Sequence, residues 1–252
     1  MTADAPDRQL RRDLHPGWSR EEVLAAITGM RDAHPTAKPP REEGLRERKK
    51  RLTRQQISDV ATLMFCERGF DTVRVSEIAA EVGVSEKTVY NYFPTKESLV
   101  FDRADELADE LRSALRDRPP GSSAADAVER MLEHELEHYV AAEDLIQPMM
   151  LEFGRLIETT PALRAGMRDL MARLVDVVAE QLAEEAGVDR EDPEPQLAAR
   201  ALIAVWDVHM VTRRRHILAG LTGTALQAAV RKDIRRASRI VSDGLDSWKP
   251  AG

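Results

Sequence analysis

Apolar side chains recur at steps of three and four residues along most of this chain. The clearest stripe lies between Thr53 and Gly69 and consists of Ile57, Val60, Ala61, Met64 and Phe65. Such steps place side chains on one face of an α-helix, and glycine commonly follows a helix end. The pattern therefore predicts an amphipathic helix that ends at Gly69.

The next apolar segments are too short for long helices and are separated by a glycine. Two helical units are predicted at residues 76–82 and 86–93, with Gly83 between them and Ser85 as the cap of the second. Glycine adopts the left-handed conformation of such a turn without steric cost. The small Ala79 permits a close helix crossing, and Val84 and Val89 supply its apolar contacts. This spacing predicts a helix-turn-helix.

Beyond Pro94 the chain alternates between helical stripes and turn signals. Helices are expected at about 95–118, 124–142, 148–158, 163–186, 195–218 and 225–248. Upstream, Ser19 and Glu22 form a capping-box pattern before an amphipathic stretch over residues 20–32. We expect an all-α protein with an extension at 1–45, a helix-turn-helix domain at 46–97 and a helical bundle at 98–252.

Composition supports this interpretation. Aromatic residues make up 4% of the 252 residues and apolar residues 42%, which favours helices over strands. The apolar stretch around residues 205–211 is interrupted by Asp207 and His209, so no membrane span is expected. The single cysteine, Cys66, is expected to be a buried core residue. A chain with no internal disulfide is consistent with the cytoplasm.

Charge is unevenly distributed along the chain. The formal net charge is −7, yet residues 41–101 carry eleven basic and ten acidic side chains, whereas residues 102–252 carry 20 and 28. Within the near-neutral segment the basic residues cluster at Arg46, Arg48, Lys49, Lys50, Arg51 and Arg54. Because a local cluster matters more to phosphate than the overall sum, this run is a candidate DNA contact. It would act as a flexible arm or, alternatively, be a solvated, charge-mixed extension of the following helix.

The run GFDTVRVSEIAAEVGVSEKTVYNYFPTKESLV, with its Tyr-x-x-Phe and Lys-Glu, resembles the TetR/AcrR family of bacterial regulators. The resemblance is specific over about residues 51–101. It implies a homodimer that binds a double-stranded DNA operator and is released by a small-molecule effector. Arg74 departs from the family pattern, which usually has Thr or Ser at this helix start.

DNA reading requires donors on the first turn of a helix that fits the major groove, with flanking groups on the phosphates. The resemblance implies that Thr88, Tyr90 and Tyr92 contact DNA and that Lys96 binds a phosphate. The structural alternatives are a solvated surface lysine for Lys96 and a core tyrosine with its hydroxyl exposed for Tyr90. The full set of candidate DNA-binding residues is Arg48, Lys49, Lys50, Arg51, Arg54, Arg74, Ser76, Ser85, Glu86, Lys87, Thr88, Tyr90, Asn91, Tyr92 and Lys96.

One segment matches an enzyme signature. His134-Glu135-Leu136-Glu137-His138 fits H-E-x-x-H, in which two histidines one turn apart bind zinc and the glutamate activates water. Glu133 and Glu137 surround the pair with charge, and no third ligand stands at an evident spacing. We therefore expect no enzyme, no metal and no cofactor, and keep a zinc hydrolase at His134 and His138 as a remote alternative.

The C-terminal helices carry two further candidate sites. Bundle pockets are lined by apolar side chains with a few polar groups. The candidate ligand-binding residues are Met149, Met150, Phe153, Ile157, Trp206, His209 and Met210. Ordinary core packing is the alternative for each. The candidate dimer-interface residues are Ala201, Ala204, Val205, Val208, Ile234, Ala237, Val241 and Leu245.

Together these features predict a repressor released from a palindromic operator by a hydrophobic or aromatic molecule. An activator or a helical protein-interaction module is the alternative. Two-fold symmetry of a dimer is the reason to expect a palindrome.

Overall fold

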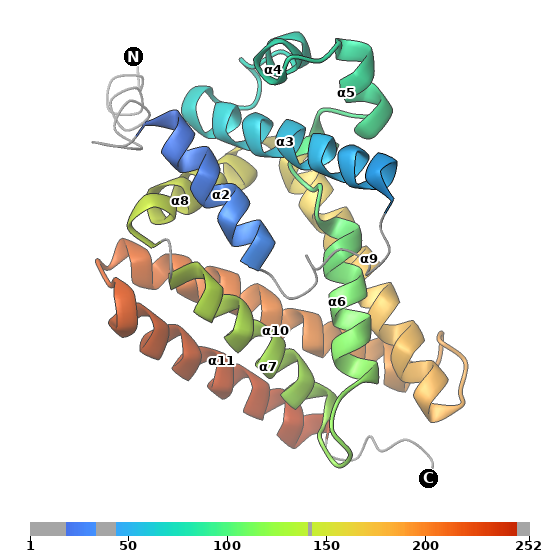
Figure 1. The fold of residues 1–252 in the computed structure, drawn as a ribbon. Coiled ribbons are helices and arrows are strands. Elements are labelled where there is room, and N and C mark those ends of the chain that lie inside the picture. The colour runs from blue at the N-terminus through green and yellow to red at the C-terminus, as the bar shows by residue number, and fades with distance from the viewer. Residues whose placement is uncertain (1–18, 34–43, 141–142, 246–252) are drawn as a thin grey trace. The chain divides into compact units, whose positions relative to one another are not determined.

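The computed structural model describes residues 19–33, 44–140 and 143–245, and within these ranges every regular element is helical. The elements are α2 (Arg20–Ala33), α3 (Leu45–Arg68), α4 (Val75–Val82), α5 (Glu86–Tyr92), the 3₁₀ turn η2 (Glu97–Leu99), α6 (Ala104–Arg116), α7 (Ala124–Val140), α8 (Glu143–Thr159), α9 (Pro161–Ala186), α10 (Pro193–Leu218) and α11 (Gly223–Leu245). Figure 1 shows their arrangement. The expected all-α fold is confirmed.

The chain forms two compact units. The first contains residues 1–102 and 142–167, and the second contains residues 103–141 and 168–252. The units therefore differ from the expected division at residue 97, because α8 and the first turn of α9 belong with the helix-turn-helix. Gly166 shows why α9 fits there: a Cβ at this position would lie 2.5 Å from Cε2 of Phe101, so only glycine leaves room for that ring.

The first unit has its core around α3, which lies beneath α4 and α5 in Figure 1. Phe65 on α3 is fully buried and packs at 5.0 Å between ring centroids against Phe70. Ile78 of α4 and Val89 of α5 are buried in the same cluster. Helices of eight and seven residues are marginal alone, so this packing is what holds α4 and α5 in place.

The predicted N-terminal helix is confirmed as α2, which packs on α3 and α8. The capping box is formed, since the Ser19 N–H donates to Glu22 at 2.7 Å and the Glu22 N–H donates to Ser19 Oγ at 3.2 Å. Val23 is fully buried, and Arg20 pairs with Glu67 of α3 at 3.1 Å. The extension thus contributes to the core of the first unit.

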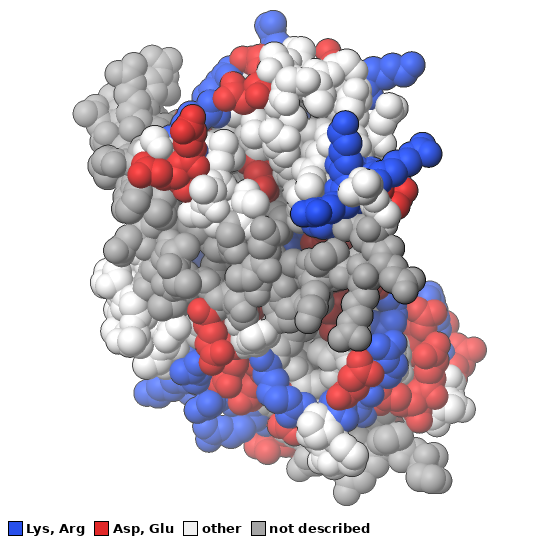
Figure 2. Space-filling view, in the orientation of Figure 1, with Lys and Arg blue, Asp and Glu red and all other residues white. Residues whose placement is uncertain are grey.

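In the second unit, α7, α10 and α11 pack together. Ion pairs connect α7 to the antiparallel α11: Arg231 lies 3.3 Å from Glu137, and Arg235 lies 2.8 Å from Glu133. The lower part of Figure 2 shows basic and acidic side chains interspersed there. Acidic residues of α7 thus face basic residues of α11 along the contact of these two helices.

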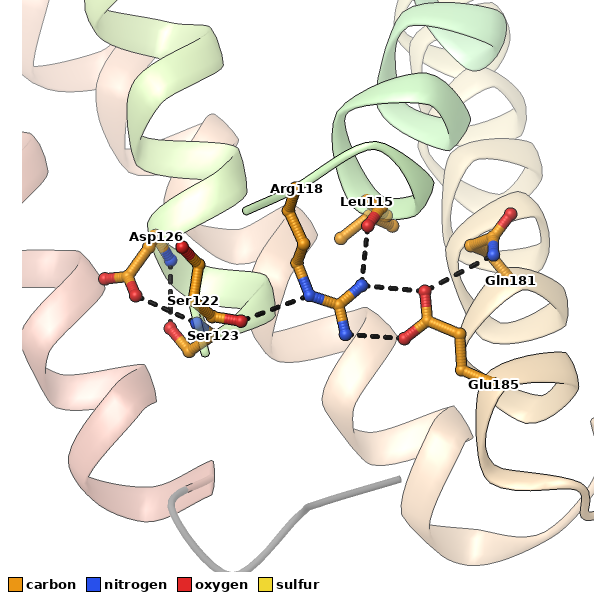
Figure 3. A network of polar contacts seen from close by, with 7 residues as sticks. All are labelled: Leu115, Arg118, Ser122, Ser123, Asp126, Gln181 and Glu185. Carbon is orange, nitrogen blue, oxygen red and sulfur yellow. Dashed lines mark hydrogen bonds and ion pairs between the residues drawn. The ribbon is translucent and has the colours of Figure 1, made fainter. Parts of the chain in front are cut away.

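The turn between α6 and α7 is tied to α9 by Arg118 (Figure 3). Its guanidinium donates to both carboxylate oxygens of Glu185 at 2.7 and 2.6 Å, and also to the carbonyls of Leu115 and Ser122. Gln181 donates to the same carboxylate at 3.3 Å. Hydrogen bonding to Glu185 raises the pKa of Arg118.

Two predicted helix boundaries are wrong. The expected helix at 95–118 is interrupted, because η2 and a turn precede α6. Leu99 and Val100, at the end of η2, are buried in the core of the first unit. Helix α8 begins at Glu143 rather than at Pro148, so the proline lies inside it, where it costs the helix one hydrogen bond.

Candidate functional site

The helix-turn-helix predicted from the sequence is present as α4 and α5. Gly83 adopts φ 76°, the left-handed conformation, and the Val84 N–H donates to the Ala79 carbonyl at 2.9 Å. Ala79 is buried at the crossing of the two helices, where its small side chain permits a close approach. These contacts close α4 and set the angle at which α5 begins.

The start of α5 is ordered and open to solvent. Ser85 Oγ accepts a hydrogen bond from the Thr88 N–H at 3.0 Å and lies 2.7 Å from Thr88 Oγ1, which confirms the predicted cap. Glu86 and Lys87 are exposed, as are Tyr90, at 45%, and Asn91. The core-tyrosine alternative for Tyr90 is therefore wrong, and this face of α5 is available to a partner.

The start of α4 is capped without the Thr or Ser that resemblance would supply. An arginine side chain has no acceptor, and it is Glu77 that accepts from the Arg74 N–H at 2.8 Å. Glu77 also pairs with Arg68 at 2.6 Å, and the backbone bond followed by this pair lowers the pKa of Glu77. Arg74 and Ser76 are exposed beside this cap.

Arg54 does not extend toward solvent as a phosphate contact would. Its guanidinium donates to the carbonyls of Tyr92 at 2.9 Å and Asp102 at 3.2 Å, and it lies 4.4 Å from the ring centroid of Phe93. These contacts occupy two of the five guanidinium donors, and a direct contact of Arg54 with DNA stays a prediction. The neighbouring Arg51 is half-buried and donates to Gln55 at 3.3 Å.

Lys96 also packs inward. Its ammonium donates to the Phe70 carbonyl at 2.5 Å and lies 4.4 Å from the Phe70 ring centroid, so the solvated-lysine alternative is wrong. Burial lowers the pKa of Lys96, while Asp71 and Glu97 act in the opposite direction. An ammonium has three donors, and a phosphate contact through the others stays a prediction.

The basic run forms the first turns of α3. Helix α3 begins at Leu45, so the flexible arm expected for residues 46–54 is wrong and the charge-mixed helical extension is what the chain adopts. Arg46, Arg48, Lys49 and Lys50 are all exposed. Figure 2 shows basic side chains gathered where Figure 1 places this end of α3. A rigid helix holds these charges at fixed positions.

The H-E-x-x-H segment lies on α7, and its glutamates serve helix packing. Glu135 lies 3.8 Å from Arg213 of α10, whereas Glu133 and Glu137 pair with arginines of α11. His134 is exposed, and the side chain of His138 lies outside the described residues. Among described side chains, no three His, Cys, Asp or Glu residues are grouped for a metal.

The candidate ligand residues of α8 belong to the first unit and contribute to its core. Met149 is buried in a cluster with Val23, Leu63 and Cys66, and Met150 and Phe153 pack against it. Ile157 is half-buried. Cys66 is fully buried, as expected, and burial raises the pKa of its thiol. Core packing, the structural alternative for these residues, accounts for Met149.

The candidate ligand residues of α10 belong to the second unit. His209 is fully buried, and neither ring nitrogen has a hydrogen-bond partner among the described residues. Trp206 Nε1 and Ser238 Oγ of α11 are buried and equally unpartnered there, while Met210 is half-buried. Burial, with the charge of Arg213, lowers the pKa of His209. Unpaired buried polar groups are costly and call for an explanation. Sequence periodicity gave no signal for Ser238.

The candidate dimer surface divides between exposed and buried residues. Ala204 and Val208 of α10 are exposed and Ala201 is half-buried, whereas Val205 and Ile234 are buried within the protomer. The prediction that Val205 and Ile234 form an interface is therefore wrong. Ala237 and Val241 are half-buried, and the side chain of Leu245 lies outside the described residues. Further exposed apolar residues of α10, which were not among the predicted interface residues, are Leu197, Val211 and Leu218.

No helix within the described part of the chain is long and apolar enough to cross a lipid bilayer.

Both the N-terminal and the C-terminal part of the chain match models of known protein families. Residues 57–102 match the family model "Bacterial regulatory proteins, tetR family", and residues 123–231 match "MftR C-terminal domain". The chain is 29% identical to the transcriptional regulator TcmR of Streptomyces glaucescens over 228 residues, covering 87% of this chain and 92% of TcmR. It is 27% identical to the regulator MftR of Mycobacterium tuberculosis, over 63% of this chain and 78% of MftR.

Among solved structures, the chain is similar to Thermus thermophilus FadR, a repressor crystallised with lauroyl-CoA. That comparison has a TM-score of 0.47 and 24% identity, and it covers 76% of this chain and 94% of FadR.

Proposed function

Because the chain belongs to the TetR family and is a DNA-binding transcriptional regulator, we propose that it represses transcription from a palindromic operator and is released by a small apolar effector. The observation that carries the DNA-binding half is the open first turn of α5, capped by Ser85, on the same unit as the exposed basic turns of α3.

The proposed contacts divide by kind. Lys87, Thr88 and Tyr90 on α5 read base edges or the adjacent backbone, since a helix in the major groove presents its first turns to the bases. Arg48, Lys49 and Lys50 bind phosphates, because they are exposed cations on a helix of the same unit. This division predicts that α5 sets sequence preference and that α3 sets affinity.

The surface of α10 supports a homodimer. An apolar stripe at the three- and four-residue steps of helix pairing lies open along this helix; it consists of the exposed Leu197, Ala204, Val208 and Val211 and the half-buried Ala201. A second copy of the same helix would cover the stripe through a two-fold axis, and two heads related by that axis bind a palindrome.

The effector half of the proposal is supported by Trp206 and His209. Their nitrogens are buried without a hydrogen-bond partner among the described residues, and the charge of Arg213 acts on His209, which suits an aromatic or aliphatic molecule that bears an oxygen. Binding would favour a spacing of the two heads that no longer matches the operator.

Selection of bound DNA from a random pool, with affinity followed against salt, tests the proposal. A recovered palindrome with a steep salt dependence is the expected result, and no enrichment would contradict it. In vitro transcription from the recovered site then separates repression from activation, and a fall in operator affinity on adding an effector tests release.

A further inference from the structure

We propose that Arg54 is a positioning residue: it clamps the C-terminal end of α5 and the backbone before α6, and thereby holds α5 at the angle that DNA binding requires. The DNA-binding part of this inference rests on the proposed function. The contacts of Arg54 are to backbone atoms and an aromatic ring of this chain, at 2.9 Å to Tyr92 O, 3.2 Å to Asp102 O and 4.4 Å to the Phe93 centroid.

The end of α5 needs such a partner. The last four carbonyls of a helix receive no hydrogen bond from an N–H of the same helix, and α5 has only seven residues. Ser85 fixes its first turn, whereas Phe93 follows it in extended conformation and supplies no side-chain hydrogen bond. Arg54, on α3, therefore donates a hydrogen bond to the carbonyl of the last residue of α5. A cation at a helix C-terminus also interacts favourably with the helix dipole.

The second acceptor extends the clamp to the following segment. Asp102 is immediately followed by Arg103, the N-cap residue of α6. One turn along α3, Ser58 Oγ donates to the Leu99 carbonyl at 3.1 Å and is fully buried. Two side chains of α3 thus hold three carbonyls between the end of α5 and the start of α6.

The guanidinium is needed for this geometry. Its planar fork reaches two carbonyls and stacks on a ring at once, whereas a lysine ammonium is a point charge on a flexible stem. Arg54→Lys therefore keeps the charge and loses the clamp. Arg54→Gln removes both.

Operator affinity and its salt dependence distinguish a positioning residue from a phosphate contact. For Arg54→Lys and Arg54→Gln we expect affinity to fall by about tenfold to a hundredfold with an unchanged salt slope. The matched control is Lys49→Gln, at an exposed cation on the same helix, for which the slope should decrease by about 1. Full affinity in Arg54→Lys, or a reduced slope in Arg54→Gln at intact fold, would overturn the proposal.

A second measurement needs no DNA and so separates this inference from the proposed function. Hydrogen exchange of the α5 amides should accelerate by about tenfold in Arg54→Lys, while exchange in α11 stays unchanged. Unchanged exchange in α5 would overturn the clamp even if the operator is never found. Circular dichroism confirms that each variant is folded, and the lysine variant alone decides if Arg54→Gln does not fold.

Discussion

At the scale of single residues, burial separates ion pairs that look alike in the sequence. Arg116 pairs with Asp117 at 2.9 Å on the surface, where the side chains are 58% and 63% exposed. Arg118 pairs with Glu185 at 2.6 Å where the side chains are 15% and 21% exposed. Surface pairs contribute little, whereas a partly buried pair leaves unpaired groups behind when it is broken.

Arg118→Ala is expected to lower the free energy of unfolding by about 1–3 kcal/mol, because Glu185 and the Leu115 and Ser122 carbonyls lose a charged donor. Chemical denaturation measures this difference. Arg116→Ala is the matched control and should leave the midpoint unchanged. An equal loss of unfolding free energy in the two variants would show that the contacts of Arg118 do not stabilise the turn.

His209 gives stability a dependence on pH. Its pKa in the folded protein lies well below 6.5, so below about pH 6.5 the unfolded chain binds a proton that the folded chain does not. Stability is therefore retained above this pH and falls as the pH decreases, by up to about 1.4 kcal/mol per unit. Denaturation between pH 7.5 and pH 5 should show a smaller decrease for His209→Leu than for the wild type. The exposed His134→Leu should follow the wild type, and parallel curves for all three proteins would contradict the assignment.

At the scale of elements, α3 has two functions along one helix. Its last turns carry Phe65 and the core, and its first turns carry the exposed basic run. Arg54 lies where the two parts meet and faces inward. Charge along a helix therefore does not identify DNA contacts until its faces are known.

Replacing Arg48, Lys49 and Lys50 together with glutamine should weaken binding to every DNA sequence and lower the salt slope by about 2–3. Fluorescence anisotropy at several salt concentrations measures both quantities. The control replaces Arg116, Arg190 and Lys232, three exposed cations of the second unit, and should retain the slope. An unchanged slope in the first variant would remove α3 from the interface.

At the scale of the whole molecule, the proposed function depends on the proposed homodimer. The α10 stripe is apolar and exposed in the protomer, with Val211 at 61% and Leu197 at 67%. Contiguous apolar surface of this kind marks an interaction site. We expect the stripe to join two copies and so to fix the distance between the two α5 helices.

Val208→Lys combined with Val211→Lys should convert the dimer to a monomer, because like charges would meet across the two-fold axis. Light scattering at micromolar protein concentration measures the oligomeric state. The affinity of the variant for a full palindrome should fall to its affinity for a half-site. Val188, in the turn after α9, is 44% exposed, between Val208 at 37% and Val211 at 61%, and Val188→Lys should leave the dimer intact. A dimer that survives the double substitution would place the interface elsewhere.

Local sequence patterns were enough to predict the helix-turn-helix, the caps at Ser19 and Ser85 and most of the helices, although not the break before α6 or the start of α8. These features depend on hydrogen bonds and side-chain steps within a few residues, so their signal is local. The contacts of Arg54 and Lys96, the burial of Val205 and the packing of α8 with the first unit appear only in the tertiary structure. Arg54 meets partners 38 and 48 residues away in the chain, and which face of a helix is covered depends on such distant segments.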